Sequence, residues 1–162
     1  MIFAKKSLGQ NFLIDKNITK KIVNLVEIKN RNVVEIGPGK GALTEEILLK
    51  KPRSLKIVEK DFDLSKRLKL KYLNNKIIDV YNDDILKLNL EKIIKNNSII
   101  FGNLPYNISS QILIKILKIN NLKDKLSDII FMFQKELGQK ITGKYQSSDY
   151  GRLSIITNFK LK

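Results

Sequence analysis

The chain has 162 residues, of which 43% are hydrophobic and 29% charged, and these proportions are typical of one globular domain. Cysteine and histidine are both absent, which excludes disulfide frameworks, thiolate metal sites and Ser-His or Cys-His catalysis, and no apolar run approaches the length of a membrane span. The formal charge of +15 favours a polyanionic partner in the cytoplasm, although a general richness in lysine, asparagine and isoleucine would also account for it.

Residues 1–15 form a basic and then apolar arm without a clear period, and we expect this arm to lie over a pocket. Asp15 is the predicted N-cap of a helix over residues 16–28, whose apolar face comprises Ile18, Ile22, Leu25 and Val26. Beyond it, short apolar runs alternate with amphipathic stretches. Strands are predicted at 32–36, 55–59, 77–81, 98–102 and 128–133, and helices around 43–48, 61–70, 90–95, 109–116 (capped by Ser109 or Ser110) and 135–141, with a final amphipathic helix from Arg152.

This alternation predicts an α/β fold with a doubly wound, mostly parallel sheet and right-handed crossovers. In such a sheet a ligand binds beyond the carboxyl ends of the strands, near the point where the strand order reverses. Residues that follow four of the predicted strands should therefore meet at one edge. They are Gly37 and Gly39 after the first strand, Glu59 and Lys60 at the end of the second, Asp84 and Ile85 after the third, and Asn103 after the fourth.

These residues suit a ligand that contains adenosine. The glycines allow close approach to the backbone, and Glu59 can accept hydrogen bonds from both ribose hydroxyls. Asp84 can accept from the adenine amine while the backbone N–H of Ile85 donates to a ring nitrogen. Residues 37–42 also satisfy the dinucleotide fingerprint G-x-G-x-x-A, so the glycines and the glutamate alone do not distinguish NAD from S-adenosylmethionine. No acidic residues cluster at metal-ligand spacing, so we expect no metal site.

The run Asn103-Leu104-Pro105-Tyr106 favours S-adenosylmethionine. The Asn103 side chain and the Leu104 carbonyl can each accept from an exocyclic N–H, and Pro105 restricts the preceding residue so that this carbonyl points outward. Tyr106 offers an aromatic face for a flipped base. Hydride transfer has no use for such a clamp, so these four residues are candidates for catalysing methyl transfer to an adenine amine.

Five motifs then indicate a family: residues 8–13 (LGQNFL), 34–39 (VEIGPG), 101–109 (FGNLPYNIS), 133–136 (FQKE) and 150–154 (YGRLS). Over nearly its whole length the chain resembles ribosomal RNA adenine N6,N6-dimethyltransferases of the dimethyladenosine transferase (KsgA) type. The resemblance implies a class I, Rossmann-like methyltransferase fold, with residues 1–162 forming the domain that binds S-adenosylmethionine. By the same resemblance, Asn11 and Leu13, with the neighbouring Gln10, close over the cofactor, Gly37 lines its methionine and ribose side, and Asn103 stands at its methyl group.

The reaction that the resemblance implies is the methylation, twice each, of two adjacent adenosines near the 3′ end of small-subunit rRNA. The partner would be an immature small ribosomal subunit, and Lys5, Lys6, Lys144 and Arg152 are candidate phosphate contacts. The resemblance also implies two further strands and a small helical domain that this sequence lacks, so residues 128–133 should form an exposed sheet edge, while the family implies no oligomer. Three alternatives remain: a catalytically impaired rRNA-docking module for subunit assembly, a large-subunit adenine methyltransferase of the macrolide-resistance type, and an NAD-dependent oxidoreductase.

Overall fold

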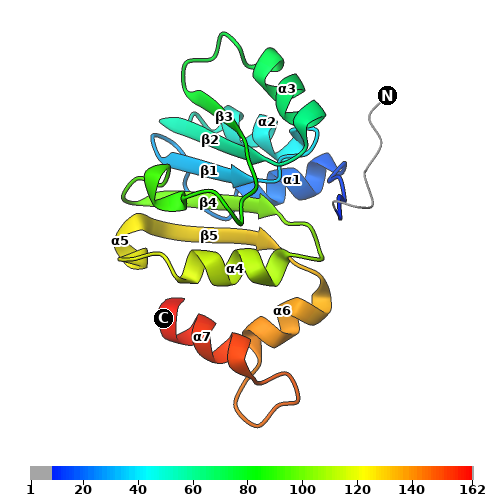
Figure 1. The fold of residues 1–162 in the computed structure, drawn as a ribbon, viewed down its shortest axis with the longest axis vertical. Helices are drawn as coiled ribbons and strands as arrows, with labels where there is room; N and C mark the ends of the chain where they lie inside the picture. Colours follow the sequence, from blue (N-terminus) through cyan, green and yellow to red (C-terminus); the bar gives the residue numbers. More distant parts are fainter. Residues whose placement is uncertain (1–8, 162) are drawn as a thin grey trace.

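The computed structural model describes residues 9–161. Within that part of the chain, five parallel strands form one sheet in the order β3-β2-β1-β4-β5 (Figure 1). The strands are β1 (Asn32–Ile36), β2 (Ser54–Glu59), β3 (Ile78–Asn82), β4 (Ser98–Asn103) and β5 (Leu126–Met132). The strand order reverses between β1 and β4, which confirms the predicted doubly wound sheet and its switch point.

Helices cover both faces of this sheet. They are α1 (Lys16–Val23), α2 (Ala42–Leu49), α3 (Phe62–Lys71), the short 3-10 helix η2 (Leu90–Lys92), α4 (Ser109–Leu117), α5 (Leu122–Lys125), α6 (Lys135–Thr142) and α7 (Arg152–Leu161). Successive residues of a strand point to opposite faces, so Val33 packs in a core with α1, α2 and α3, while Val34 packs in a second core with α4 and η2. Burial on both faces explains why the strands are nearly continuous apolar runs.

The predicted N-cap of α1 is confirmed and the predicted length is wrong; of the predicted apolar face, Ile22 and Val26 pack against the core, but Ile18 and Leu25 do not. Asp15 accepts hydrogen bonds from two backbone N–H groups of the first turn, at 2.8 and 3.3 Å. The helix ends at Val23 rather than at residue 28, because the following segment must turn to enter β1. Thr19 and Val23 are the buried residues, whereas Ile18 and Leu25 are 44% and 68% exposed.

The predicted cap of α4 is also wrong. Residue 108 occupies the N-cap position without a side-chain hydrogen bond, and both Ser109 and Ser110 lie inside the helix. The Ser109 hydroxyl donates instead to the carbonyl of Tyr106, at 3.1 Å. This hydrogen bond connects the start of α4 to the segment that follows β4.

Three other features differ from the prediction. The helix predicted at 90–95 is only the single 3-10 turn η2, and α5 has no counterpart among the predicted elements. α7 begins at Arg152 as expected, but it is not amphipathic: Ile155 and Phe159 are exposed, with Phe159 at 79%, while only Ser154 is buried. Its apolar residues therefore point in several directions, and α7 packs through a limited area against α4 and α6.

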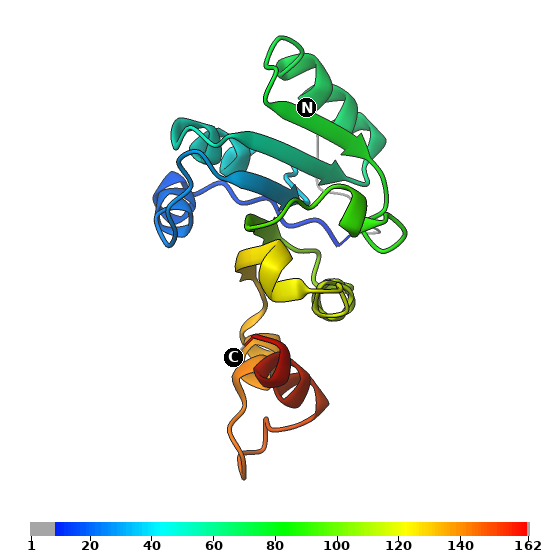
Figure 2. The same ribbon diagram turned by 90° about the vertical axis from the view of Figure 1, so that its left-hand side faces the viewer.

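The predicted exposed edge is present at β5. Among the described residues, β5 pairs with β4 alone, so its other side is the edge of the sheet. The helices α6 and α7 follow β5 and lie beyond this edge (Figures 1 and 2). None of the helices between residues 9 and 161 combines the length and the apolar character that crossing a bilayer requires.

Candidate functional site

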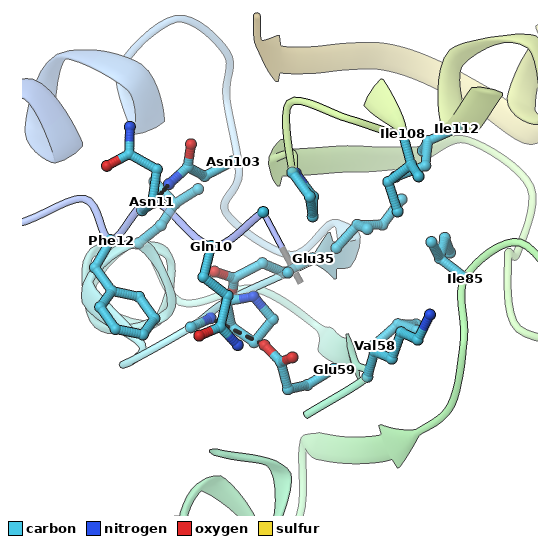
Figure 3. A pocket seen from close by; sticks show the side chains of 18 of the residues that line it. Gln10, Asn11, Phe12, Glu35, Val58, Glu59, Ile85, Asn103, Ile108 and Ile112 are labelled. Carbon is cyan, nitrogen blue, oxygen red and sulfur yellow. Dashed lines mark hydrogen bonds between the residues drawn. The ribbon is translucent and has the colours of Figure 1, made fainter. Parts of the chain in front are cut away.

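A cavity opens at the carboxyl ends of the strands (Figure 3). The N-terminal arm, the turn after β1, the ends of β2, β3 and β4, and the start of α4 all contribute to it. The predicted cofactor-binding residues all line this cavity, and Pro105 joins them. They are Gln10, Asn11, Leu13, Gly37, Gly39, Glu59, Lys60, Asp84, Ile85 and Asn103.

The turn after β1 forms the floor of the cavity and needs its glycines. Gly37 and Gly39 have φ angles of +65° and +59°, in the left-handed region that other residues adopt only with strain. A Cβ atom at Gly39 would lie 2.9 Å from the Phe12 ring, and one at Gly37 would lie 3.4 Å from the carbonyl of Asn103. The turn therefore contacts both the N-terminal arm and the end of β4.

Glu59 connects two sides of the cavity through backbone amides. One carboxylate oxygen accepts from the N–H of Gly39 at 3.2 Å, and the other accepts from the N–H of Asp61 at 2.9 Å. Burial raises the pKa of Glu59, and these two hydrogen bonds oppose that rise. Each oxygen accepts one bond from the protein, which leaves a lone pair on each for two hydroxyl donors.

Asp84 follows β3, the strand next to the one that ends in Glu59, and forms a salt bridge. Its carboxylate lies 3.0 Å from the Lys60 ammonium and accepts from the N–H of Leu86 at 2.9 Å. Burial opposes ionisation, but the Leu86 hydrogen bond and the Lys60 charge outweigh it, so the pKa of Asp84 is lowered. Among the described residues, the backbone N–H of Ile85 has no hydrogen-bond partner, and Ile85 lines the cavity.

Asn11 of the arm holds two residues of the Asn103–Tyr106 segment. The Asn103 side-chain nitrogen donates to the Asn11 carbonyl at 2.7 Å, and the Asn11 side-chain nitrogen donates to the Tyr106 hydroxyl at 2.8 Å. Tyr106 is 43% exposed and lies beside the cavity rather than in its lining. The Leu104 side chain is buried in the core, and Pro105 lines the cavity.

Glu35 is a lining residue that the sequence reasoning missed. It lies on β1, is almost completely buried, and accepts from the Thr44 hydroxyl at 2.7 Å through one oxygen. Its other oxygen is buried and has no hydrogen-bond partner among the described residues. Burial raises the pKa of Glu35 to about 8, and the nearby Glu59 charge adds to the rise. The sequence did contain a signal for this site residue, because Glu35 is the single carboxylate within the otherwise apolar run 33–36.

The other missed lining residues come from the arm, the glycine turn and the start of α2, the ends of β1, β2 and β3, and the start of α4. Phe12 packs on the glycine turn, with the Lys40 ammonium 4.9 Å from its ring centroid. No short pattern marks Phe12, because it reaches the cavity only through tertiary packing. The others are Gly9, Ile36, Pro38, Lys40, Ala42, Leu43, Val58, Asp83, Asn107, Ile108 and Ile112.

Two of the four candidate phosphate contacts lie within the described residues, and neither lines the cavity. Lys144 and Arg152 are exposed on the α6–α7 segment and do not line it, so their contact with RNA stays a prediction. Lys5 and Lys6 lie outside the described residues. Within residues 9–161 there is no group of acidic side chains that could hold a metal ion.

Comparison with known proteins places this site in a family. The sequence model of the family described as ribosomal RNA adenine dimethylase matches residues 2–162. The ribosomal RNA small subunit methyltransferase A of Pelagibacter ubique is 50% identical over 159 residues, which cover 98% of this chain and 60% of that protein. The protein of the same name from a Wolbachia strain of Drosophila simulans is 45% identical, over 97% of this chain and 57% of its own length. The chain thus spans about 60% of the length of these relatives.

Solved structures agree with the sequence comparison. A dimethyladenosine transferase from Plasmodium falciparum has a TM-score of 0.74 and 26% identity, over 91% of this chain and 52% of that one. The 23S rRNA methyltransferase ErmE has a TM-score of 0.73 and 30% identity, over 91% of this chain and 55% of its own. The fold, the cavity and the motifs at its rim lead to one assignment: the chain belongs to the ribosomal RNA adenine dimethylase family.

Proposed function

We propose that this chain binds S-adenosylmethionine in the cavity and transfers methyl groups to the N6 atoms of two adjacent adenosines near the 3′ end of small-subunit rRNA. The family membership and the 50% identity to a small-subunit methyltransferase support this substrate. The partner we propose is an immature small ribosomal subunit, and the compartment is then the cytoplasm.

The donor groups around the cavity fit the adenosine part of the cofactor. Glu59 retains a lone pair on each oxygen for the two ribose hydroxyls. Asp84, which its lowered pKa keeps ionised, can accept from the adenine amine. The unpartnered N–H of Ile85 can donate to a ring nitrogen. In this arrangement Gln10, Asn11 and Leu13 of the arm would close over the cofactor.

The observation that carries the proposal is the orientation of the Asn103 side chain. Because its nitrogen donates to the Asn11 carbonyl, its oxygen is the group left to accept a hydrogen bond from a substrate. An exocyclic adenine amine has two N–H donors, and accepting from one favours a pyramidal nitrogen with a localised lone pair. The cofactor would supply an electrophilic methyl group; as the N–C bond forms and the C–S bond breaks, the amine releases a proton to solvent.

The neighbours of Asn103 complete the proposed substrate site. The Leu104 carbonyl would accept from the second N–H, and the Tyr106 ring, held through its hydroxyl by Asn11, would stack on the base. Flipping a base out of its stack costs a few kcal/mol, and this cost is lowest where the base is already unpaired, as in an RNA loop. Catalysis would then come mainly from alignment of the amine. After the first methylation one N–H remains, so a single acceptor must suffice for the second.

The test is methyl incorporation from labelled S-adenosylmethionine into small ribosomal subunits that lack these methylations. We expect Asn103→Ala to lower the transfer rate by about 100-fold or more, the range that removing one well-placed polar group from a reaction site produces. Asn96→Ala, at an exposed asparagine before β4, is the matched control and should retain the parent rate. A near-native rate in Asn103→Ala with cofactor still bound would show that the assigned role is wrong.

Three other outcomes would point to the alternatives. Calorimetric binding of NAD in preference to S-adenosylmethionine would indicate an oxidoreductase. Cofactor binding and subunit binding without transfer would indicate a docking module. Transfer to large-subunit rather than small-subunit RNA would indicate a large-subunit adenine methyltransferase, the class to which the structurally similar 23S rRNA methyltransferase ErmE belongs.

A further inference from the structure

The loops that precede the strands carry most of the unpaired positive charge at the ends of the sheet. In a parallel sheet these loops meet at the edge opposite the cavity, and Figure 2 is viewed from that side. We define the basic edge as the five exposed cations in these loops: Lys29 before β1, Lys51 and Arg53 before β2, Lys76 before β3 and Lys95 before β4. The same loops hold one acidic residue, Glu27, while Asp124 lies in α5 between Lys123 and Lys125.

The cavity edge has a different balance. Among the described residues, its cations Lys40, Lys60, Lys87 and Lys135 are offset by at least as many carboxylates, namely Glu59, Asp61, Asp83 and Asp84 at the ends of β2 and β3 and Glu136 beside Lys135. The two edges share one sheet and one amino-acid composition. Compositional bias toward lysine would enrich both of them, so it does not account for this difference.

Hydrogen bonds hold the loops of the basic edge together. The N–H of Asn30 donates to the carbonyl of Lys51 at 3.0 Å, and the N–H of Arg53 donates to the carbonyl of Arg31 at 2.8 Å. The loops before β1 and β2 are therefore joined by their backbones. The N–H of Leu55 donates to the carbonyl of residue 77 at 2.7 Å, which connects the loop before β3.

Arg31 extends this connection to the other half of the sheet. Its guanidinium donates to the carbonyl and the side-chain oxygen of Asn97, at 3.1 and 3.0 Å, and to the Ser127 hydroxyl. The N–H of Asn97 in turn donates to the carbonyl of Asp124 at 2.8 Å. The segments before all five strands are therefore connected, which fixes the backbone positions from which the cations of the basic edge extend.

The cations of the basic edge are available to a partner. Among the described residues, none of the five cations forms an ion pair, and the pairs Lys60–Asp84 and Lys71–Glu45 lie away from this edge. Attraction to helix carboxyl termini would be the simplest structural reason for lysines here, but it is confined to the last turn of a helix. Lys29, Arg53 and Lys76 lie several residues beyond the ends of α1, α2 and α3, so that attraction does not explain them.

We infer that the basic edge is a second RNA-binding surface, which contacts the phosphate backbone on the side of the domain opposite the cavity. Neighbouring strands lie about 4.8 Å apart, so cations at successive strand starts form a row that can follow a phosphate backbone. Strands of five to six residues separate the two edges by roughly 17–20 Å. The RNA class of the partner rests on the proposed function; the phosphate chemistry of the surface does not.

The experiment compares RNA binding by two variants of the full chain. The basic-edge variant replaces Lys29, Lys51, Arg53 and Lys76 by glutamine. Its affinity for deproteinised small-subunit rRNA is measured by fluorescence anisotropy between about 50 and 200 mM salt. We expect affinity to fall at least about tenfold and the slope of log K against log salt to decrease by about 3, since each lost phosphate contact contributes about 0.7–0.9.

The control variant removes the same charge elsewhere. It places glutamine at Lys66, Arg67, Lys69 and Lys92. These four residues are exposed on α3 and η2 and have no ion-pair partner among the described residues. We expect its affinity and slope to stay within about a factor of three of the parent. Calorimetric binding of S-adenosylmethionine by both variants, equal to that of the parent, shows that they are folded.

The outcomes separate this inference from the proposed function. Equal weakening in the two variants, parent-like binding by the basic-edge variant, or absence of RNA binding by the parent would overturn the inference. If the variants differ as expected and the parent transfers no methyl group, the proposed function is wrong and the inference stands. If the parent transfers methyl groups and the variants bind alike, the inference is wrong and the proposed function stands.

Discussion

Glu35 makes the stability of the fold depend on pH in a way that one substitution can isolate. Its carboxyl is buried in β1 among apolar side chains, with one hydrogen bond from Thr44. Burial raises its pKa to about 8, so it is protonated in the folded chain at neutral pH. In the unfolded chain its pKa returns to an ordinary 4.5.

The sign and size of the effect follow from these two values. Between pH 4.5 and about 8 the folded chain binds a proton that the unfolded chain has released, so the free energy of unfolding falls as pH rises through this range. The values differ by about 3.5, and each pKa unit corresponds to about 1.4 kcal/mol, which gives a loss of at most about 5 kcal/mol. The chain has no histidine and no cysteine, so few other groups titrate in the same interval.

Glu35→Gln keeps the shape of the protonated side chain and removes its titration. We expect urea unfolding from about pH 5 to about pH 8 to show the parent losing several kcal/mol relative to this variant. Glu136→Gln, at an exposed glutamate, is the control and should follow the parent at every pH. If the parent and Glu35→Gln curves run parallel across the interval, the carboxyl is already ionised in the folded chain and the reasoning is wrong.

Three further changes test the site and its support. Gly39→Ala places a Cβ 2.9 Å from the Phe12 ring at a positive φ, so we expect urea unfolding to show a loss of about 1–2 kcal/mol and calorimetry to show weaker binding of S-adenosylmethionine. Asn11→Ala removes the hydrogen bond to the Tyr106 hydroxyl, so methyl transfer should fall several-fold while thermal stability stays close to that of the parent; an unchanged rate would contradict a positioning role. Phe101→Ala empties a fully buried site on β4 and should cost about 3–5 kcal/mol in urea unfolding, with a cost below about 1 kcal/mol contradicting the packing described.

The strands could be predicted because their pattern is local. A strand buried on both faces is a short apolar run, and polar residues at its carboxyl end indicate the ligand edge; Glu59 and Asn103 are examples, and both line the cavity. The N-cap role of Asp15 was equally local, since it needs only the first turn of a helix. For these features, residues close together in the sequence determine the local structure.

What could not be predicted depends on tertiary packing. The end of α1 at Val23 is set by the path of the chain into β1, and the face of α1 that is buried depends on where α2 lies. Ser109 was expected to cap α4, but the helix starts one residue earlier than that role requires, and the Ser109 hydroxyl donates to the carbonyl of Tyr106 instead. Phe12 reaches the cavity only because the arm crosses the glycine turn, which no spacing within the arm indicates.

The connections made by Arg31 also constrain the order of events during synthesis. Its partner Asn97 is 66 residues further along, and β1 lies between β2 and a strand that starts only after Asn97. At about 5–20 residues per second, the ribosome needs about 3–13 s to make that interval. During this time the edge of β1 that will face β4 stays unpaired, while its other edge can already pair with β2. A chaperone would therefore have this interval in which to bind the unpaired edge of the nascent chain.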